Sequence, residues 1–511
     1  MAFFFKEYNR LHRKIQIFIL AMIFLVSGFV MHVYATEGIM KDRPGAKADE
    51  EHSAPVSYPD VYGCSPLMDP DIYKGSHKIL KFIYPGKDGF LFRSADFRTD
   101  FSIPDKTLFY MKQVNARLKR KGVDLVVIVQ PPRAVQMTDY LDPAHIPEGY
   151  DPDVAKRNFK GFLQKLNSEG ITAVDLTNPP KDVRYFFKGD PHWRREGAQW
   201  SAEKVAEVVR QNPKYKDIPK EEFAIEITWW LESEKGEFDE FVEGACNVTW
   251  PPDRRPMWAT TSLTNDVSSD SLFGDVTYPD IAIVGTSNTA HEEDFNFAGS
   301  LKQALHADVR NRALSAGGFS GASLVYYATD EFQEHPPKVL LWEFLAHHDY
   351  NDYVGLRQML PAIDGVCKSE DALAETEVKI TPSHWVAQKM AQDAAAANAY
   401  GPMQKAKSKK PLVYDFTVFR NLDDKKILGK GSYLYMEVTN PEIRVLHAGI
   451  LYTDGEADQV DLSRSLRVDN NGKYYLLFNP DIDKDVAMVQ IETDKMVGDV
   501  KARICKDNGS L

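Results

Sequence analysis

The feature that most limits the possible folds is a series of short apolar strands separated by amphipathic helices. Val123–Val129 is almost entirely apolar and rich in β-branched residues, and similar runs cover Asp280–Val284 and Lys338–Phe344. Continuous apolar runs of this length are typical of parallel strands buried on both faces. Further predicted elements are the strand Thr172–Leu176 and the helices Leu108–Lys121, Asp153–Ser168, Glu196–Arg210 and Phe297–His306. This alternation predicts an α/β fold with a three-layer domain.

The pattern changes toward the C-terminus. From Leu412 onward, short β-type segments separated by turn residues predict a small antiparallel β-sandwich. We therefore expect an α/β domain over residues 59–366, a linker or helical connector over 367–410, and a β-sandwich over 411–511. An insertion over 225–275, which contains four tryptophans, interrupts the α/β domain, and insertions of this kind often build a substrate cleft.

The first 35 residues have the pattern of a secretory signal peptide. Four basic residues precede an apolar run over 15–30, and Val33-Tyr34-Ala35 offers small residues where a signal peptidase cuts. We expect export with cleavage after Ala35. An uncleaved membrane anchor is the alternative, because the run is only a little shorter than a membrane span. Residues 36–58 are rich in charge, glycine and proline, and predict an exposed N-terminal segment.

Charge and cysteine content narrow the choice of partners. The formal charge is -12, and removing residues 1–35, which carry +3, leaves -15. Such acidity disfavours nucleic acid as a partner, and a polyanionic substrate would need a local basic groove. Four cysteines without a C-x-x-C pair fit two disulfides in an exported chain, with three possible pairings. Their order along the chain suggests Cys64 with Cys246 and Cys367 with Cys505. Neither zinc nor any other metal or cofactor is expected.

Two short motifs carry the candidate chemistry. Asp190-Pro191-His192-Trp193 places a carboxylate two residues before an imidazole, and Gly285-Thr286-Ser287 directly follows an apolar strand. A carboxylate that accepts from one ring nitrogen of a histidine leaves the other free to take a proton from a serine. The alternative is that Asp190 caps the following helix and His192 only packs beside it. Taken together, the motifs predict a triad of Ser287, His192 and Asp190 for acyl transfer, with oxyanion donors near Ser287 and at Gly317 and Gly318.

The chain resembles the AlgX/AlgJ family of SGNH-hydrolase-like acetyltransferases over essentially its whole mature length. Besides the two motifs, the resemblance rests on Asn296-Phe297-Ala298-Gly299, on Trp342-Glu343-Phe344, and on the C-terminal β-domain with its cysteine pair. It implies an SGNH-like domain joined to a carbohydrate-binding module, with the family's Asp, His and Ser at Asp190, His192 and Ser287. Asp190 and His192 precede Ser287, which is the order of the acetyltransferase subgroup and not of simple SGNH esterases. No clear G-x-N block is present, so the asparagine oxyanion donor stays unassigned.

The resemblance also implies a place and a substrate. Such proteins are periplasmic and acetylate mannuronate hydroxyls of alginate, an anionic polysaccharide, within an alginate synthesis and export complex. Candidate carbohydrate-binding residues in the β-domain are Thr417, Phe419, Arg420, Lys425 and Lys426. The alternative is that these residues belong to ordinary sandwich surface. His384-Trp385 and His347-His348 lack the carboxylates or cysteines of a metal site and are interpreted as structural.

These observations favour an exported polysaccharide O-acetyltransferase. Ser287 would carry the acetyl group and His192 would then activate a sugar hydroxyl. Two alternatives stay open: a carbohydrate esterase that uses the same triad with water as the acceptor, and a non-catalytic polymer-binding scaffold of the export complex.

Overall fold

The structure is a computed structural model that describes residues 56–263, 278–351, 353–379, 414–422, 426–464, 470–493, 495, 497–507 and 509. The chain divides into a unit over Met1–Ser57 and a second, compact unit over Tyr58–Leu511. The predicted signal peptide, residues 1–35, and most of the exposed segment, 36–58, lie outside the described residues. Within the described part, no helix has both the length and the apolar character needed to span a bilayer.

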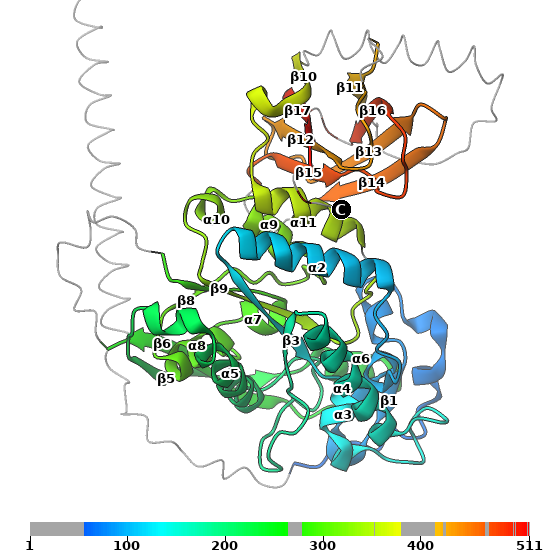
Figure 1. Cartoon of the computed structure of the whole chain (residues 1–511). Helices are drawn as coiled ribbons and strands as arrows, with labels where there is room; N and C mark the ends of the chain where they lie inside the picture. Colours follow the sequence, from blue (N-terminus) through cyan, green and yellow to red (C-terminus); the bar gives the residue numbers. More distant parts are fainter. Residues whose placement is uncertain are drawn as a thin grey trace, which may run out of the picture. The chain divides into compact units, whose positions relative to one another are not determined.

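A five-stranded parallel sheet forms the centre of the first domain, as the alternation of strands and helices predicts (Figure 1). Its spatial order is β4-β3-β9-β7-β8, and every neighbouring pair is parallel. The strands are β3 (Asp124–Gln130), β4 (Thr172–Val174), β7 (Ile281–Val284), β8 (Val309–Asn311) and β9 (Val339–Leu345). Strands β3, β7 and β9 are buried over nearly their whole length, so their apolar runs reflect cover on both faces.

Helices cover both faces of this sheet. Successive residues of a strand point to opposite faces, so Val127 belongs to one core cluster and Val126 to the other. The first cluster includes side chains of α2 (Asp105–Arg120), α4 (Pro152–Ser168), α9 (Gly321–Tyr327) and α11 (Tyr353–Asp364). The second includes side chains of α5 (Arg195–Arg210) and α8 (Phe297–Leu305). The short elements of the domain are β1 (Ile83–Pro85), β2 (Leu91–Arg93), α3 (Arg133–Gln136), α7 (Ser287–Ala290) and α10 (Asp330–Glu334).

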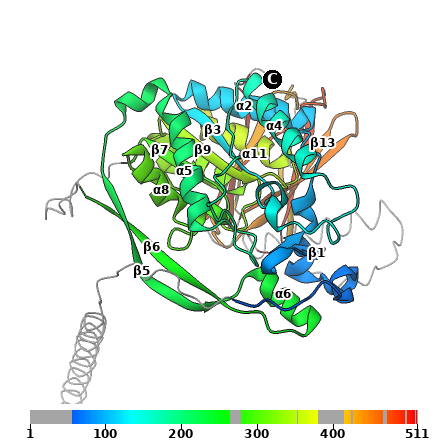
Figure 2. The ribbon, with the colours of Figure 1, turned by 90° about the horizontal axis from the view of Figure 1, so that it is seen from below.

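The predicted insertion is a long antiparallel hairpin with a helix at its tip (Figure 2). Strand β5 (Phe223–Glu234) leads into α6 (Glu237–Cys246), and β6 (Asp253–Ser262) returns. The disulfide Cys64–Cys246 ties the end of α6 to the segment before β1, and both pack into one small core around Trp250. The tip of the insertion is thereby anchored at a second point.

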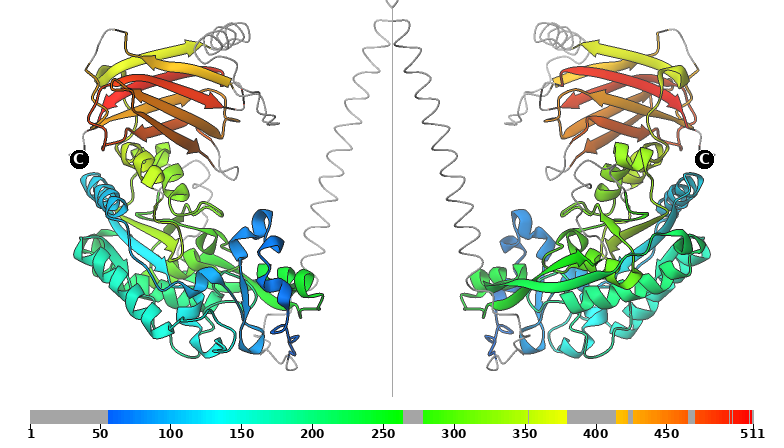
Figure 3. Two further views of the ribbon diagram at one scale, coloured as in Figure 1. Left: turned by 90° about the vertical axis from the view of Figure 1, so that its right-hand side faces the viewer. Right: turned by 90° about the vertical axis from the view of Figure 1, so that its left-hand side faces the viewer.

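The C-terminal domain is a sandwich of two four-stranded antiparallel sheets (Figure 3). One sheet has the order β10-β17-β12-β15 and the other β11-β16-β13-β14. The strands are β10 (Ala372–Lys379), β11 (Tyr414–Arg420), β12 (Ser432–Val438), β13 (Val445–Tyr452), β14 (Ala457–Ser463), β15 (Lys473–Leu477), β16 (Val486–Thr493) and β17 (Asp499–Lys506). The residues predicted as connector, 367–410, therefore include a strand, β10, that pairs with β17. The rest of that connector, from residue 380, lies outside the described residues.

The sandwich packs directly on α11. Tyr435 and Tyr475 belong to the same core cluster as α11 and α2, and the Arg357 Nε donates to the carbonyl of Leu477 at 2.9 Å. The fully buried guanidinium of Arg117 pairs with Asp507 at 2.6 Å. The disulfide Cys367–Cys505 closes the same junction, so both disulfides have the pairing suggested by the order of the cysteines.

Candidate active site

The loop before α5 folds Asp190 back onto His192. The carboxylate oxygen Oδ1 of Asp190 lies 2.7 Å from His192 Nδ1 and also accepts from the backbone N–H of His192 at 2.9 Å. The cap of α5 is Arg194, whose side chain makes no capping bond, so Asp190 is not the cap of that helix. The alternative role for Asp190 is therefore wrong.

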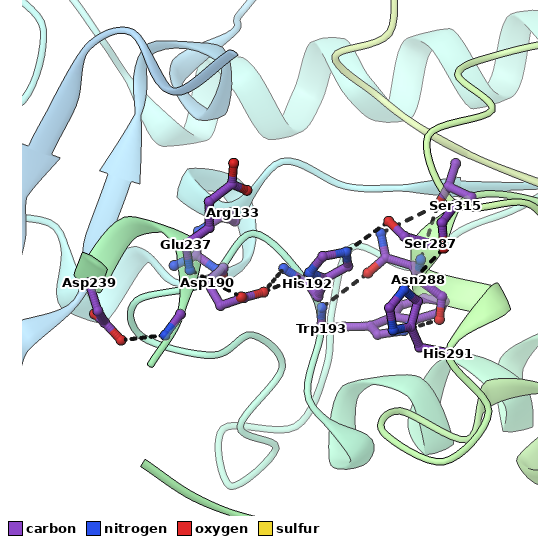
Figure 4. Close-up of polar contacts among 12 residues, drawn as sticks. Arg133, Asp190, His192, Trp193, Glu237, Asp239, Ser287, Asn288, His291 and Ser315 are labelled. Carbon is purple, nitrogen blue, oxygen red and sulfur yellow. Dashed lines mark hydrogen bonds and ion pairs between the residues drawn. The ribbon is translucent and has the colours of Figure 1, made fainter. Parts of the chain in front are cut away.

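Ser287 is the first residue of α7, at the carboxyl end of the buried strand β7. Its Oγ lies 2.8 Å from His192 Nε2, so the structure brings Asp190, His192 and Ser287 into one hydrogen-bonded chain (Figure 4). An ionised Asp190 can only accept, which places a proton on Nδ1 and leaves Nε2 as the acceptor for the Ser287 hydroxyl. The arrangement can transfer the Ser287 proton to His192.

Burial and neighbouring charges shift the pKa of Asp190 in opposite directions. Burial alone would raise its pKa, but the hydrogen bond and charge of His192, together with the charge of Arg255, hold the pKa well below its usual value. A weak bond from the backbone N–H of Glu237 to Oδ2, at 3.4 Å, adds to this. The Arg133 Nη1 donates to the carbonyl of Asp190 at 2.6 Å and fixes the loop. Asp190 is therefore ionised at neutral pH.

Asn288 joins the histidine loop to the serine turn, a role that its place beside Ser287 alone did not indicate. Its side-chain oxygen accepts from the backbone N–H of Trp193 at 3.2 Å, and its carbonyl accepts from the indole of Trp193 at 3.0 Å. Its Nδ2 donates to Gln130 Oε1 at 3.1 Å, at the end of β3. These buried hydrogen bonds of Asn288 to Trp193 and Gln130 therefore fix the serine turn relative to the loop that carries His192.

A second buried carboxylate, Glu343, forms hydrogen bonds with the residues on either side of Ser287. It lies at the end of β9 and accepts from the Thr286 N–H at 2.7 Å and from the hydroxyls of Thr286 and Thr289 at 2.9 and 3.2 Å. Burial raises the pKa of Glu343 to about 7, although these donors oppose the shift. A Cβ at Gly285 would lie 2.6 Å from Glu343 Oε2, so only glycine fits there. The Trp342-Glu343-Phe344 motif was the available sequence signal for this residue.

Aromatic rings line the open side of His192. The ring of Phe295 stacks on His192 with centroids 5.1 Å apart, and His291 lies 5.9 Å from His192. His291 Nε2 is 3.0 Å from the hydroxyl of Ser315. Ser287 itself is half-buried and His192 is partly exposed, so both can be reached from solvent.

Gly317 and Gly318, the two glycines predicted as oxyanion donors, differ in whether the backbone N–H already has an acceptor. The N–H of Gly317 already donates to the carbonyl of Leu314 at 3.1 Å, so this glycine is not a free donor and the prediction for it is wrong. Gly318 has a positive φ of 61°, and its N–H has no acceptor among the described residues. The N–H of Ser287 lies in the first turn of α7, where no intrahelical acceptor exists. Ser287 and Gly318 therefore stay as candidate donors.

The candidate carbohydrate-binding residues in the sandwich differ in their exposure to solvent. A bulge between Thr417 and Phe419 turns both Val418 and Phe419 into the core, where Phe419 is 8% exposed. Phe419 therefore cannot offer a ring face to a sugar, contrary to the prediction. Thr417 is half-buried, Arg420 and Lys426 are exposed, and Lys425 lies outside the described residues.

Within the described ranges, no group of three histidine, cysteine, aspartate or glutamate side chains is placed to hold a metal ion. His347 pairs with Arg93 at 2.8 Å, and burial lowers the pKa of His348 to about 4, which is consistent with structural roles. His384-Trp385 lies outside the described residues.

The fold and the site define an SGNH-hydrolase-like domain joined to a C-terminal β-sandwich. The family described as "SGNH hydrolase-like domain, acetyltransferase AlgX" matches residues 83–346. The alginate biosynthesis protein AlgX of Pseudomonas aeruginosa is 30% identical over 431 residues, which cover 82% of this chain and 83% of that protein. A solved structure of P. aeruginosa AlgX, 28% identical, superposes with a TM-score of 0.73 over 87% of this chain and 99% of that one. A probable alginate O-acetylase AlgJ of the same species is 29% identical over 51% of this chain and 68% of its own length. The chain belongs to the AlgX family of SGNH-hydrolase-like acetyltransferases.

Proposed function

We propose that this protein acetylates mannuronate hydroxyls of alginate through an acetyl-enzyme formed on Ser287. The hydrogen-bonded chain from Asp190 through His192 to Ser287 carries the proposal, because it supplies a nucleophile, a base and an orienting carboxylate within hydrogen-bonding distance. The substrate class follows from the relatives, which are named as alginate biosynthesis proteins and as a probable alginate O-acetylase.

The first half-reaction forms the acetyl-enzyme. His192 Nε2 takes the proton of Ser287 Oγ as this oxygen attacks the carbonyl carbon of an acetyl donor. The N–H groups of Ser287 and Gly318 are the candidate donors to the resulting oxyanion. The intermediate collapses to acetyl-Ser287, and the leaving group departs with the proton held by His192. Asp190 stays ionised throughout and stabilises the imidazolium.

The second half-reaction runs the same steps with a sugar as the nucleophile. His192 accepts the proton of a mannuronate hydroxyl, the hydroxyl oxygen attacks acetyl-Ser287, and the acetylated sugar leaves. The proton returns from His192 to Ser287 Oγ, so enzyme and charges are restored. Transfer exceeds hydrolysis when the bound sugar displaces water from the face of His192.

The remaining parts of the proposal concern organisation and location. Residues 59–366 act as the acetyltransferase domain, and the sandwich over 411–511, completed by β10, acts as a carbohydrate-binding module in which Thr417, Arg420 and Lys426 are the exposed or half-buried candidates. The protein works in the periplasm after export by its N-terminal segment, in a complex for alginate synthesis and export. Two disulfides suit an oxidising compartment of this kind.

The decisive experiment measures acetylation of the secreted polymer in cells that carry Ser287→Ala. We expect acetylation to be abolished while the protein stays folded and still binds mannuronate oligomers. Unchanged acetylation would mean that the protein is a scaffold and would overturn the mechanism. With purified wild-type protein, acetyl release from a donor without acetylated oligomer would identify an esterase in place of a transferase.

A further inference from the structure

Arg255 on β6 is a buried cation without a hydrogen-bond partner. Its side chain is enclosed, with 8% of the residue exposed, and its Nε is buried without an acceptor. Within the described part of the chain, its guanidinium makes no hydrogen bond and no ion pair. The neighbouring arginines make bonds through their Nη atoms, since Arg133 donates to backbone carbonyls and Arg194 pairs with Asp253. The Nε of Arg133 is buried without an acceptor as well, so among the described residues Arg255 differs in having no bond at any guanidinium nitrogen. An enclosed guanidinium without an acceptor in the protein is costly, so its nitrogens are available to an anionic group.

Its position links it to the proposed acetyltransferase site. The guanidinium lies 4.0 Å from the ring centroid of Phe187, and Phe187 packs on Phe295 with centroids 6.0 Å apart. Phe295 in turn stacks on His192. The charge of Arg255 is also among the causes that lower the pKa of Asp190. Arg255 therefore lies two aromatic rings from the imidazole that would activate the acceptor hydroxyl.

An acceptor without a partner directly precedes Phe295, the ring that joins Phe187 to His192. Oδ1 of Asp294 is buried and has no donor among the described residues. Burial and the charge of Asp190 raise the pKa of Asp294, whereas the charges of Arg255, His291 and His192 oppose this shift. A guanidinium and a carboxylate oxygen without partners in the described part of the chain, both joined to His192 through Phe295, together fit a ligand that has both a carboxylate and hydroxyl groups. A neutral sugar would satisfy only Asp294.

We propose that Arg255 binds the carboxylate of the acceptor sugar acid and that Asp294 accepts from one of its hydroxyls. The inference rests on the proposed function, and it assigns to the site itself the selection of a uronic acid over a neutral sugar. The planar fork of arginine matches a carboxylate in a bidentate geometry, which fixes the orientation of the sugar as well as its charge. The hydroxyl to be acetylated is thereby positioned at His192.

The test compares acceptors, with 4-nitrophenyl acetate as donor for the purified full-length protein. The rate constant kcat/KM for acetyl transfer is measured for mannuronate oligomers, for their methyl esters and for mannose oligomers of equal length. We expect wild type to favour the acid over both neutral acceptors by at least about 10-fold, and Arg255→Gln to bring this ratio close to one. Arg254→Gln is the matched control, because Arg254 is exposed on the same strand and stacks on Trp230 at 4.1 Å. It should keep the wild-type ratio.

A ratio that is unchanged in Arg255→Gln, with all rates lowered equally, would overturn the proposal, since it would mean that Arg255 only keeps Asp190 ionised. Equal use of the acid and its methyl ester by wild type would overturn it without any variant, which covers the case in which Arg255→Gln does not fold. Failure of the proposed function is seen separately, as wild type that transfers acetyl to no acceptor. Calorimetric binding of the acid and ester oligomers, with wild type and Arg255→Gln, would then still test the carboxylate site.

Discussion

Two regions of this molecule hold an aspartate–histidine pair of almost the same geometry. In the α/β domain, His192 Nδ1 lies 2.7 Å from Asp190, and in the sandwich His447 Nδ1 lies 2.6 Å from Asp461. The two pairs differ in their surroundings. The Asp190 side chain is 12% exposed and that of Asp461 is 71% exposed, and only His192 has a serine at its second nitrogen. The pair alone is therefore uninformative. Burial of the aspartate and a serine at the second ring nitrogen distinguish a candidate active site from a solvent-exposed ion pair.

The same contrast holds for the two domains as a whole. The α/β domain buries one carboxylate beside the serine turn, Glu343, and another beside Asp190, Asp239, and burial raises the pKa of both to about 7. In the sandwich, the buried groups with displaced pKa values are mainly tyrosines, such as Tyr452 and Tyr475, whose pKa burial raises. Neutral tyrosines are retained in a core at little electrostatic cost, whereas carboxylates are not. The difference favours the first domain as the site of the proposed chemistry and is compatible with a binding role for the second.

The largest expected effect comes from breaking the two pairs in parallel. Asp190→Asn should lower the rate of acetyl-enzyme formation by about 10³–10⁴-fold, because the amide no longer fixes the tautomer of His192 or stabilises its imidazolium. Asp461→Asn should leave that rate unchanged, since an exposed pair without a nucleophile contributes nothing to it. The measurement is the burst of 4-nitrophenol from 4-nitrophenyl acetate. Similar rates for the two variants would contradict the assignment of the active site.

The sequence predicted the regular parts of the α/β domain well, for a physical reason. Strands such as Val123–Val129 are buried on both faces, so their apolar runs survive in any context. The Asp190 and Ser287 motifs were also visible, because both lie at strand or helix ends where local geometry fixes their place. Of the three possible disulfide pairings, the one suggested by the order of the cysteines is the one that the structure has.

The features that the sequence did not predict depend on contacts between residues that lie far apart along the chain. β10 was assigned to a connector because its partner, β17, lies more than a hundred residues away. Phe419 was expected at the surface because the bulge beside it leaves no mark in a pattern of alternating residues. Arg255 carries no local signal in the sequence, and its burial against Phe187 separates it from the exposed Arg254. Tertiary burial of a charge is not written in local sequence.

A smaller effect should separate the two disulfides. They close segments of 182 and 138 residues, so loop entropy predicts costs of removal that differ by only about 0.2 kcal/mol, within a typical loss of about 2–4 kcal/mol. Only Cys64–Cys246 holds α6, whose first turn donates to Gly189 and Asp190.

Replacing both cysteines of each bond by serine tests this difference. We expect Cys64→Ser/Cys246→Ser to lower thermal stability and also to slow acetyl-enzyme formation by about 10-fold, through a looser Asp190 loop. Cys367→Ser/Cys505→Ser should lower stability to a similar extent without slowing that step. Thermal unfolding and the 4-nitrophenol burst are measured on the same samples. Equal rates in the two double variants would show that α6 does not position Asp190.

The smallest effect concerns Asp239, the buried carboxylate that caps α6 behind Asp190. Its Oδ2 accepts from the N–H of Gly236 at 3.0 Å, and burial together with the charge of Asp190 raises its pKa to about 7. A group whose pKa is higher in the folded state contributes stability at low pH and loses it as pH rises through the folded pKa. Asp239→Asn keeps an acceptor for Gly236 and removes this titration. The stability of the variant relative to wild type, measured as the difference between their free energies of unfolding, should therefore rise by about 1–3 kcal/mol from pH 5 to pH 8. Urea unfolding at several pH values measures this difference. A difference independent of pH would mean that the pKa of Asp239 is not raised in the folded protein. Asp239 would then no longer support the contrast between buried carboxylates in the α/β domain and buried tyrosines in the sandwich.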